Sequence, residues 1–238
     1  MKKFISTFLI ASLLVLFSSV VAFAEVSPET YEQSPEYFTQ ENLEKIKEHN
    51  EKVEGYITSK NMLRAGSSKK LSVPIYTQQT NYTCGPACAR MVLKYLGYTY
   101  SESQLATASD TTDDSGAIVW KLRQAINDRI SSGDGYIEKY IGSSGFSDNL
   151  IYSIDNDRPV ICHTMAYELD YYNNNTAFHG HYIVANGYRY GMSGSTSDST
   201  AYIIDPNYDS RYNGEFTCDW GNVNEAIAAN AGYIIMSE

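Results

Sequence analysis

Positive charge is scarce in this 238-residue chain, which has 18 lysine and arginine residues against 28 aspartate and glutamate residues. The formal net charge is −10. Because proteins bind nucleic acid through basic side chains that neutralise phosphates, we do not expect a nucleic-acid partner. An acidic surface suits basic substrates or a cell-wall surface, but an acidic surface that is simply solvated explains the charge equally well. The net charge therefore does not identify a substrate.

Long apolar runs are also rare. The only one covers residues 4–21, follows a basic start and ends at a small-residue cleavage site closed by Ala24. This pattern predicts a secretory signal peptide over residues 1–24. No later segment is apolar enough to span a bilayer, and no cysteine follows the cleavage site to carry a lipid. We therefore expect a bacterial protein that is secreted, extracellular or cell-wall associated, with no membrane partner after signal removal.

Residues 25–70 differ from the rest because they are highly charged and poor in apolar side chains. Within them, Thr39 can begin a helix whose few apolar residues recur at helical spacing, namely Leu43, Ile46, Val53 and Ile57. Residues 64–70 then have the composition of a flexible basic linker. The segment is predicted to be a charged pro-segment or linker with an amphipathic helix.

Residues 71–238 have the pattern of one globular domain, without an internal repeat. Helices are predicted over 86–96, from a capping box formed by Ser101 and Gln104, over 117–130 and over 146–154. Strands are predicted over 73–76, 159–164, 181–188, 201–205, 215–218 and 231–236. Helices come first and strands follow, which predicts an α+β fold with N-terminal helices packed on an antiparallel sheet.

Cys84 is the first residue with a chemical signal. It lies where an extended segment passes into a helix, and Pro86 is suited to the first turn of that helix. The unpaired N–H groups and the dipole at a helix N-terminus favour a thiolate over a thiol. A lone cysteine at this place is more often a buried core residue, so its interpretation as a nucleophile depends on a nearby base.

His181 and Asp205 supply that context. His181 begins one predicted strand, Asp205 ends the next, and the connection between them is rich in glycine, serine and threonine. In an antiparallel hairpin the start of the first strand lies beside the end of the second. The two side chains are therefore predicted to be neighbours, as a base and the acid that orients it must be.

Five short motifs share their order and spacing with a known family. They are Val73-Pro74, Gln78 six residues before Cys84-Gly85-Pro86-Ala87, Arg158-Pro159-Val160, Gly180-His181-Tyr182-Ile183-Val184 and Ile204-Asp205-Pro206. Over residues 72–236 the chain resembles the papain-like bacteriocin-processing (double-glycine leader) peptidases and their stand-alone secreted relatives.

The resemblance implies a papain-like cysteine peptidase fold for residues 71–238, with a polypeptide or peptide substrate and no cofactor or metal. It also implies a role for each matching residue. Cys84 would be the nucleophile, His181 the general base and acid, Asp205 the orienter and Gln78 the oxyanion donor. Gln79 stays an alternative donor, although the spacing to the nucleophile favours Gln78.

Other interpretations use the same residues. A metal site could combine His163, His179, His181, Asp205 and Asp209, although zinc hydrolases usually show tighter motifs. Asp205, Asn207 and Asp209 echo the opening of a calcium loop, for which chance is the better explanation. A cell-wall amidase or endopeptidase would use the same Cys-His pair, and an inert papain-like binding module would leave it unused.

Two questions stay open in the sequence. If Cys84 is free, only Cys88, Cys162 and Cys218 remain, so we expect a buried free thiol at Cys88 and allow a bridge between the other two. Residues 25–70 are either a spacer from the cell wall or a pro-segment whose helix covers the cleft until it is cut near Arg64.

Overall fold

The structure, a computed structural model, describes residues 39–60, 65–131, 133, 135–175, 177, 179–192 and 196–238. These residues all lie in the unit Glu32–Glu238. The predicted signal peptide and the proposed cut near Arg64 lie outside the described residues. None of the helices in these ranges has both the length and the hydropathy that crossing a bilayer requires.

Six α-helices occur in the described part of the chain: α1 (Gln40–Lys60), α2 (Cys84–Tyr95), α3 (Glu102–Ala108), α4 (Val119–Asn127), α5 (Phe146–Asp155) and α6 (Trp220–Ala229). Three short 3-10 turns accompany them: η2 (Ala166–Glu168), η3 (Asp170–Tyr172) and η4 (Thr196–Asp198). The predicted capping box opens α3, since the Ser101 hydroxyl accepts from the Gln104 N–H and the Gln104 side chain accepts from the Ser101 N–H. Helix α6 was not predicted.

The strands are β1 (Ser68–Lys70), β2 (Tyr136–Tyr140), β3 (Val160–Met165), β4 (Gly180–Arg189), β5 (Thr200–Asp205), β6 (Gly214–Asp219) and β7 (Tyr233–Ser237). Within the described ranges they form a seven-stranded sheet in the order β2-β7-β3-β4-β5-β6, with β1 paired to β4. Every pairing is antiparallel. The predicted α+β class with an antiparallel sheet is thereby confirmed, although β2 was not predicted.

The start of the domain differs from the sequence prediction. The strand predicted over 73–76 is wrong, and β1 forms instead at Ser68–Lys70, inside the predicted linker. Beyond β1, the Leu71 N–H still bonds to the Asn186 carbonyl at 2.7 Å. Pro74 then has no N–H to continue a ladder. The chain therefore runs on without strand pairing towards Gln78.

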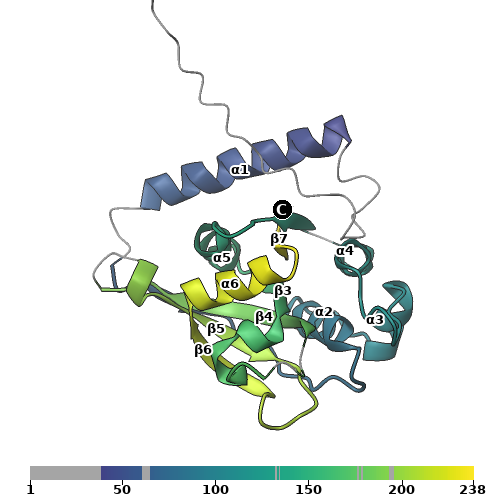
Figure 1. The fold of residues 1–238 in the computed structure, drawn as a ribbon. Coiled ribbons are helices and arrows are strands. Elements are labelled where there is room, and N and C mark those ends of the chain that lie inside the picture. The colour runs from purple at the N-terminus through teal and green to yellow at the C-terminus, as the bar shows by residue number, and fades with distance from the viewer. Residues whose placement is uncertain are drawn as a thin grey trace, which may run out of the picture. The chain divides into compact units, whose positions relative to one another are not determined.

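Helices α2, α3 and α4 pack against one another, and α2 also packs on β4 (Figure 1). The buried side of α2 includes Met91, Val92 and Leu93, all with no exposed surface. Helices α5 and α6 contact each other and both contact β3. This arrangement places the start of α2 beside the start of β4, where the predicted functional residues lie.

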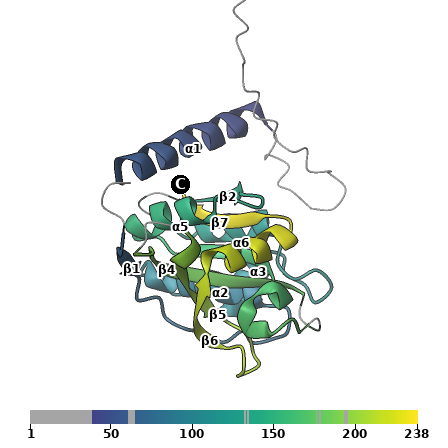
Figure 2. The ribbon, with the colours of Figure 1, turned by 60° about the vertical axis from the view of Figure 1, so that its left-hand side comes forward.

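Helix α1 packs on α5, and both can be followed in Figure 2. It buries His49, Val53 and Ile57, and the Tyr56 hydroxyl donates to the Asp155 carboxylate at 2.7 Å. Asp155 ends α5 and also accepts from Tyr188, near the end of β4 that is distant from His181. The described helix thus packs beside the end of α5, and its role as a spacer or a pro-segment stays a prediction.

Candidate active site

Cys84 is the first residue of α2, and its side chain is only 7% exposed. The neighbouring glycine brings this helix end close to the sheet. A Cβ on Gly85 would lie 2.7 Å from the Ala117 Cβ and 3.2 Å from Tyr182 Cδ2. Tyr182 follows His181 and donates its hydroxyl to the Ala117 carbonyl at 2.8 Å. The absence of a side chain at Gly85 thus allows Cys84 to approach His181.

The β4–β5 hairpin brings His181 and Asp205 together, as the sequence predicts. Its register pairs Val184 with Ile204, so Asp205 continues opposite Ile183 and His181 lies two residues further along the same face. His181 Nε2 lies 2.8 Å from Asp205 Oδ1. Cys84 also acts on this ring, since its charge and its side chain raise the pKa of His181. Because Asp205 occupies Nε2, Nδ1 is the ring nitrogen that remains available to Cys84.

The charge of His181 is set by its two partners. Burial of the ring lowers its pKa, but the charges of Asp205 and Cys84 and their hydrogen bonds outweigh this effect. Together they raise the pKa of His181 to about 10. The imidazolium form is therefore favoured at neutral pH, next to the sulfur.

Asp205 has no exposed surface and is fully hydrogen-bonded. Its Oδ1 accepts from His181 and from the Asn207 N–H at 2.8 Å. Its Oδ2 accepts the hydroxyls of Tyr171 and Tyr172, each at 2.9 Å. No pattern in the sequence assigns either tyrosine to this site, and Asn207 stands out only in the chance resemblance to a calcium loop. No local sequence signal connects the tyrosines with Asp205, more than thirty residues later.

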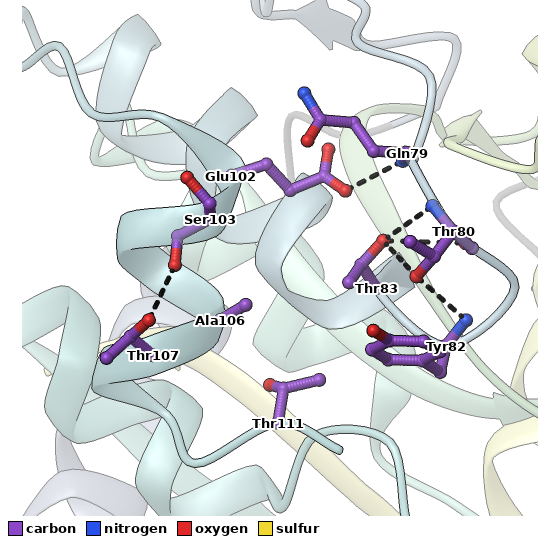
Figure 3. A pocket seen from close by; sticks show the side chains of 9 residues that line it. All are labelled: Gln79, Thr80, Tyr82, Thr83, Glu102, Ser103, Ala106, Thr107 and Thr111. Carbon is purple, nitrogen blue, oxygen red and sulfur yellow. Dashed lines mark hydrogen bonds between the residues drawn. The ribbon is translucent and has the colours of Figure 1, made fainter. Parts of the chain in front are cut away.

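Gln78 and Gln79, the two candidate oxyanion donors, lie in different environments. Gln78 is buried, its backbone N–H bonds to the Pro206 carbonyl at 2.7 Å and its side-chain Nε2 donates to the Thr80 carbonyl at 2.7 Å. An amide NH₂ has two N–H groups, so one donor of Gln78 remains. Gln79 is exposed and lines a separate pocket beside α3 (Figure 3).

That pocket, of about 270 Å³, lies between α3 and the loop of residues 79–83. Cys84, His181 and Gln78 are not among its lining residues. Glu102 reaches from α3 to this loop, and its Oε1 accepts the Gln79 N–H at 2.7 Å (Figure 3). Glu102 is 1% exposed, so this contact fixes the loop from inside the protein. The carboxylate thus helps to define the path of the chain between Gln78 and Cys84.

Among the described residues, the cysteines form no disulfide. All four cysteines are free and buried, so the expected free thiol at Cys88 is confirmed, whereas the possible bridge between Cys162 and Cys218 does not form. Burial raises the pKa of Cys88 well above its usual value and that of Cys218 to about 12. Both remain protonated thiols at neutral pH.

The residues of the alternative metal site do not converge. Within the described ranges, no three His, Cys, Asp or Glu side chains are grouped so that they could hold an ion. His163 stacks on Tyr182 with ring centres 4.4 Å apart, and Asp209 is bonded to Arg211. In the stretch that echoes a calcium loop, Asn207 Oδ1 accepts the Asp209 N–H at 2.8 Å. These side chains stabilise a turn.

Comparison with solved structures shows the fold. A C39-like peptidase from Bacillus anthracis is 17% identical, with a TM-score of 0.53, and the match covers 72% of this chain and 98% of that one. A double-glycine motif protease from a transporter, solved with a leader peptide, is also 17% identical, with a TM-score of 0.45 over 71% of this chain and 93% of that one. A ragweed pollen cysteine protease in its proform is 11% identical, with a TM-score of 0.48 over 73% and 66% of the respective chains.

The fold is therefore that of the papain-like cysteine peptidases, as the sequence resemblance implies. No curated protein matches the sequence significantly. A family model, in contrast, matches residues 70–230, which is more than half of the 238 residues. It covers all the segments that carry Gln78, Cys84, His181 and Asp205. The chain belongs to the Peptidase_C39 like family.

Proposed function

We propose that the protein is a secreted cysteine peptidase that hydrolyses peptide bonds through Cys84, His181 and Asp205, with Gln78 as an oxyanion donor. One observation carries the proposal. His181 Nε2 lies 2.8 Å from Asp205 Oδ1, and Cys84 at the start of α2 is close enough to the same ring to raise the pKa of His181. Nucleophile, base and orienting acid thus form one continuous chain.

Acylation follows from this geometry. The Cys84 thiolate attacks the scissile carbonyl carbon, and the carbonyl electrons move onto the oxygen. The remaining side-chain N–H of Gln78 and the backbone N–H of Cys84 stabilise this oxyanion. As the C–N bond breaks, His181 transfers its proton to the leaving amine. The products of this half-reaction are a free amine and a thioester on Cys84.

Deacylation uses the same groups in the reverse roles. Neutral His181 removes a proton from a water molecule, whose oxygen attacks the thioester carbonyl. The C–S bond then breaks, which releases the carboxylic acid and restores the Cys84 thiolate beside the His181 imidazolium. Throughout both steps, Asp205 holds the imidazole ring in place and balances its charge.

Gln78 is a better oxyanion donor than Gln79 for two structural reasons. Gln78 is buried, and its backbone is bonded to Pro206, the residue after Asp205. Gln79 instead presents its side chain to the separate pocket beside α3. These contacts support the assignment that the spacing in the sequence favours.

The activity can be tested with a diverse peptide library and mass spectrometry of the products. Wild-type protein should produce defined cleavage sites, and Cys84→Ala should produce none. Cys88→Ala is the matched control, because it removes a buried thiol one helical turn from Cys84 and should retain cleavage. Intact peptides with wild-type protein, together with release of fragments from peptidoglycan, would refute the proposal in favour of a cell-wall hydrolase.

We also propose that export depends on residues 1–24. The basic start, the apolar run and the small-residue site ending at Ala24 support it. When the full chain is expressed in a bacterium, protein recovered from the medium or the wall should begin at Glu25. A cell-associated protein that still begins at Met1 would contradict this proposal.

A further inference from the structure

The Asp205 carboxylate receives more hydrogen bonds than a contact with one histidine requires. His181 and the Asn207 N–H bind Oδ1, and the hydroxyls of Tyr171 and Tyr172 both bind Oδ2 at 2.9 Å. A carboxylate without exposed surface is stable as an anion only when such donors replace its hydration. The two phenols together provide half of these donors.

Both tyrosine rings are held in place from outside. The Tyr171 ring stacks on Phe216 of β6, with ring centres 4.0 Å apart and an angle of 7°. The Tyr172 ring stacks on Tyr212 at 4.3 Å and 9°, and its hydroxyl also accepts from Asn207 Nδ2 at 2.9 Å. Stacked rings leave little rotation to either phenol, so the hydroxyls point to Oδ2 before any substrate binds.

The backbone of η3 is anchored as well. Asn222 of α6 accepts from the Asp170 N–H at 3.0 Å and donates to the Glu168 carbonyl at 2.7 Å. The turn that carries the tyrosines is thereby bonded to a helix on one side and stacked on β6 on the other. Such over-determination is typical of residues that orient a reactive group.

Other titratable groups also face Asp205. These are His181 of β4, Cys88 of α2 and Cys218 of β6, and burial raises the pKa of both thiols. Burial, the Asp205 charge and the hydrogen bonds also raise the pKa of both tyrosines, although the bond from Asn207 opposes this at Tyr172. The tyrosines and these thiols therefore stay neutral at physiological pH. The charge of Asp205 is balanced by His181.

We propose that Tyr171 and Tyr172 are positioning residues of the peptidase: by binding Oδ2 they hold the Asp205 carboxylate in place and direct Oδ1 at His181. This inference rests on the proposed function, because it assigns a role within the same site. With both phenols bound to one oxygen, the carboxylate cannot rotate about its Cβ–Cγ bond without losing both bonds. The ring of His181 is thus fixed with Nδ1 toward Cys84.

The test uses Tyr171→Phe, Tyr172→Phe and the double variant, which keep the rings and remove only the hydroxyls. Tyr212→Phe is the matched control, because this ring stacks on Tyr172 but its hydroxyl accepts from Asn175. The first readout is the rate at which iodoacetamide alkylates Cys84, measured from pH 4 to 10 in wild type and all variants. It reports the reactive thiolate without requiring a known substrate.

Each single variant should lower the alkylation rate at neutral pH about tenfold, because a hydrogen bond to a charged group stabilises it by about that factor or more. The part of the pH profile set by His181 should also move to lower pH, since a displaced Asp205 raises the pKa of His181 less. The double variant should lose more than either single variant, and Tyr212→Phe should match wild type. The rate of peptide cleavage should fall in parallel.

A stability measurement distinguishes a role in positioning Asp205 from a general contribution to folding stability. Urea titration gives the folded fraction of each variant, and rates are compared per folded molecule. Rates and pH limbs in the Tyr171 and Tyr172 variants that equal those of Tyr212→Phe would overturn the inference alone. A wild-type Cys84 that reacts no faster than an ordinary thiol would refute both the inference and the proposed function.

Discussion

Gly85→Ala is the substitution whose effect can be worked out most directly from the structure. The added Cβ would lie 2.7 Å from the Ala117 Cβ and 3.2 Å from both Leu122 Cδ2 and Tyr182 Cδ2. Carbon atoms in good contact are about 3.5–4.0 Å apart. The start of α2 or the Ala117 segment must therefore move by about 1 Å, and Cys84 must move with it.

Gly85→Ala should cause a small loss of folding stability and a large loss of catalytic rate. Overpacking of this kind destabilises a protein by about 1–3 kcal/mol, which would lower the urea midpoint without a change in slope. A displacement of about 1 Å at a nucleophile can lower the rate about a hundredfold. We therefore expect Gly85→Ala to remain folded while it loses most of its kcat/KM and most of the rapid alkylation of Cys84.

Two further variants make the reasoning refutable. Gly221→Ala is the control, because a Cβ there meets no atom within 4 Å, and it should change stability by no more than about 1 kcal/mol. Ala117→Gly removes the closest obstacle, so Gly85→Ala combined with Ala117→Gly should recover part of the activity. An active Gly85→Ala variant, or a double variant with no recovery, would show that close packing at Gly85 does not position Cys84.

The remaining predictions concern the oxyanion and two histidines. Gln78→Ala should stay folded and lose about a hundredfold in kcat, whereas Gln79→Ala should retain most activity; the reverse result would assign the donor to Gln79. Because the pKa of His181 is raised to about 10, its contribution to folding stability is complete below pH 6.5 and is lost as the pH rises through 10. The same deprotonation removes the proton that the leaving amine needs, so kcat/KM should also fall near pH 10. In Asp205→Asn, which removes a charge that raises this pKa, the fall should occur at a lower pH. Burial, with a smaller effect from two nearby lysines, lowers the pKa of His49 to about 4. The contribution of neutral His49 is complete above pH 6.5 and lost as the pH falls toward 4, so proteolysis should cut α1 faster at pH 4 in wild type than in His49→Leu.

Local patterns predicted most of the fold. The capping box at Ser101 depends on residues three apart, and the strands around His181 and Asp205 follow from short apolar runs, so nearby sequence suffices for both. Strand β1 depends instead on a distant glycine. A Cβ on Gly187 would lie 2.6 Å from the Lys69 carbonyl oxygen, so only glycine lets this segment pair so closely. A three-residue strand made of one serine and two lysines has no periodicity that would reveal such a partner.

The candidate site also contains residues that local sequence predicts and residues that only the tertiary structure brings together. The positions of Cys84, His181 and Asp205 follow from a helix start, a strand start and a strand end, and a hairpin register relates the last two. Tyr171 and Tyr172 precede Asp205 by 34 and 33 residues and lie in a 3-10 turn between β3 and β4. Their contact with Oδ2 depends on how that turn is anchored to α6 and β6, which no local pattern contains.

The β4–β5 hairpin is the common frame for all four proposed catalytic residues. It carries His181 and Asp205 directly, it binds the backbone of Gln78 through the Pro206 carbonyl, and Tyr182 packs beside Gly85 next to Cys84. A shift of this hairpin by one residue would turn His181 to the other face of the sheet. The β4–β5 register shifts between Ala185 and Gly187, which leaves Asn186 free of the β5 pairing. Asn186 opposes a further shift, because its carbonyl accepts the Leu71 N–H and its side chain donates to the Leu71 carbonyl at 3.1 Å. The chain that leads to Gln78 therefore also fixes the register that aligns His181 with Asp205.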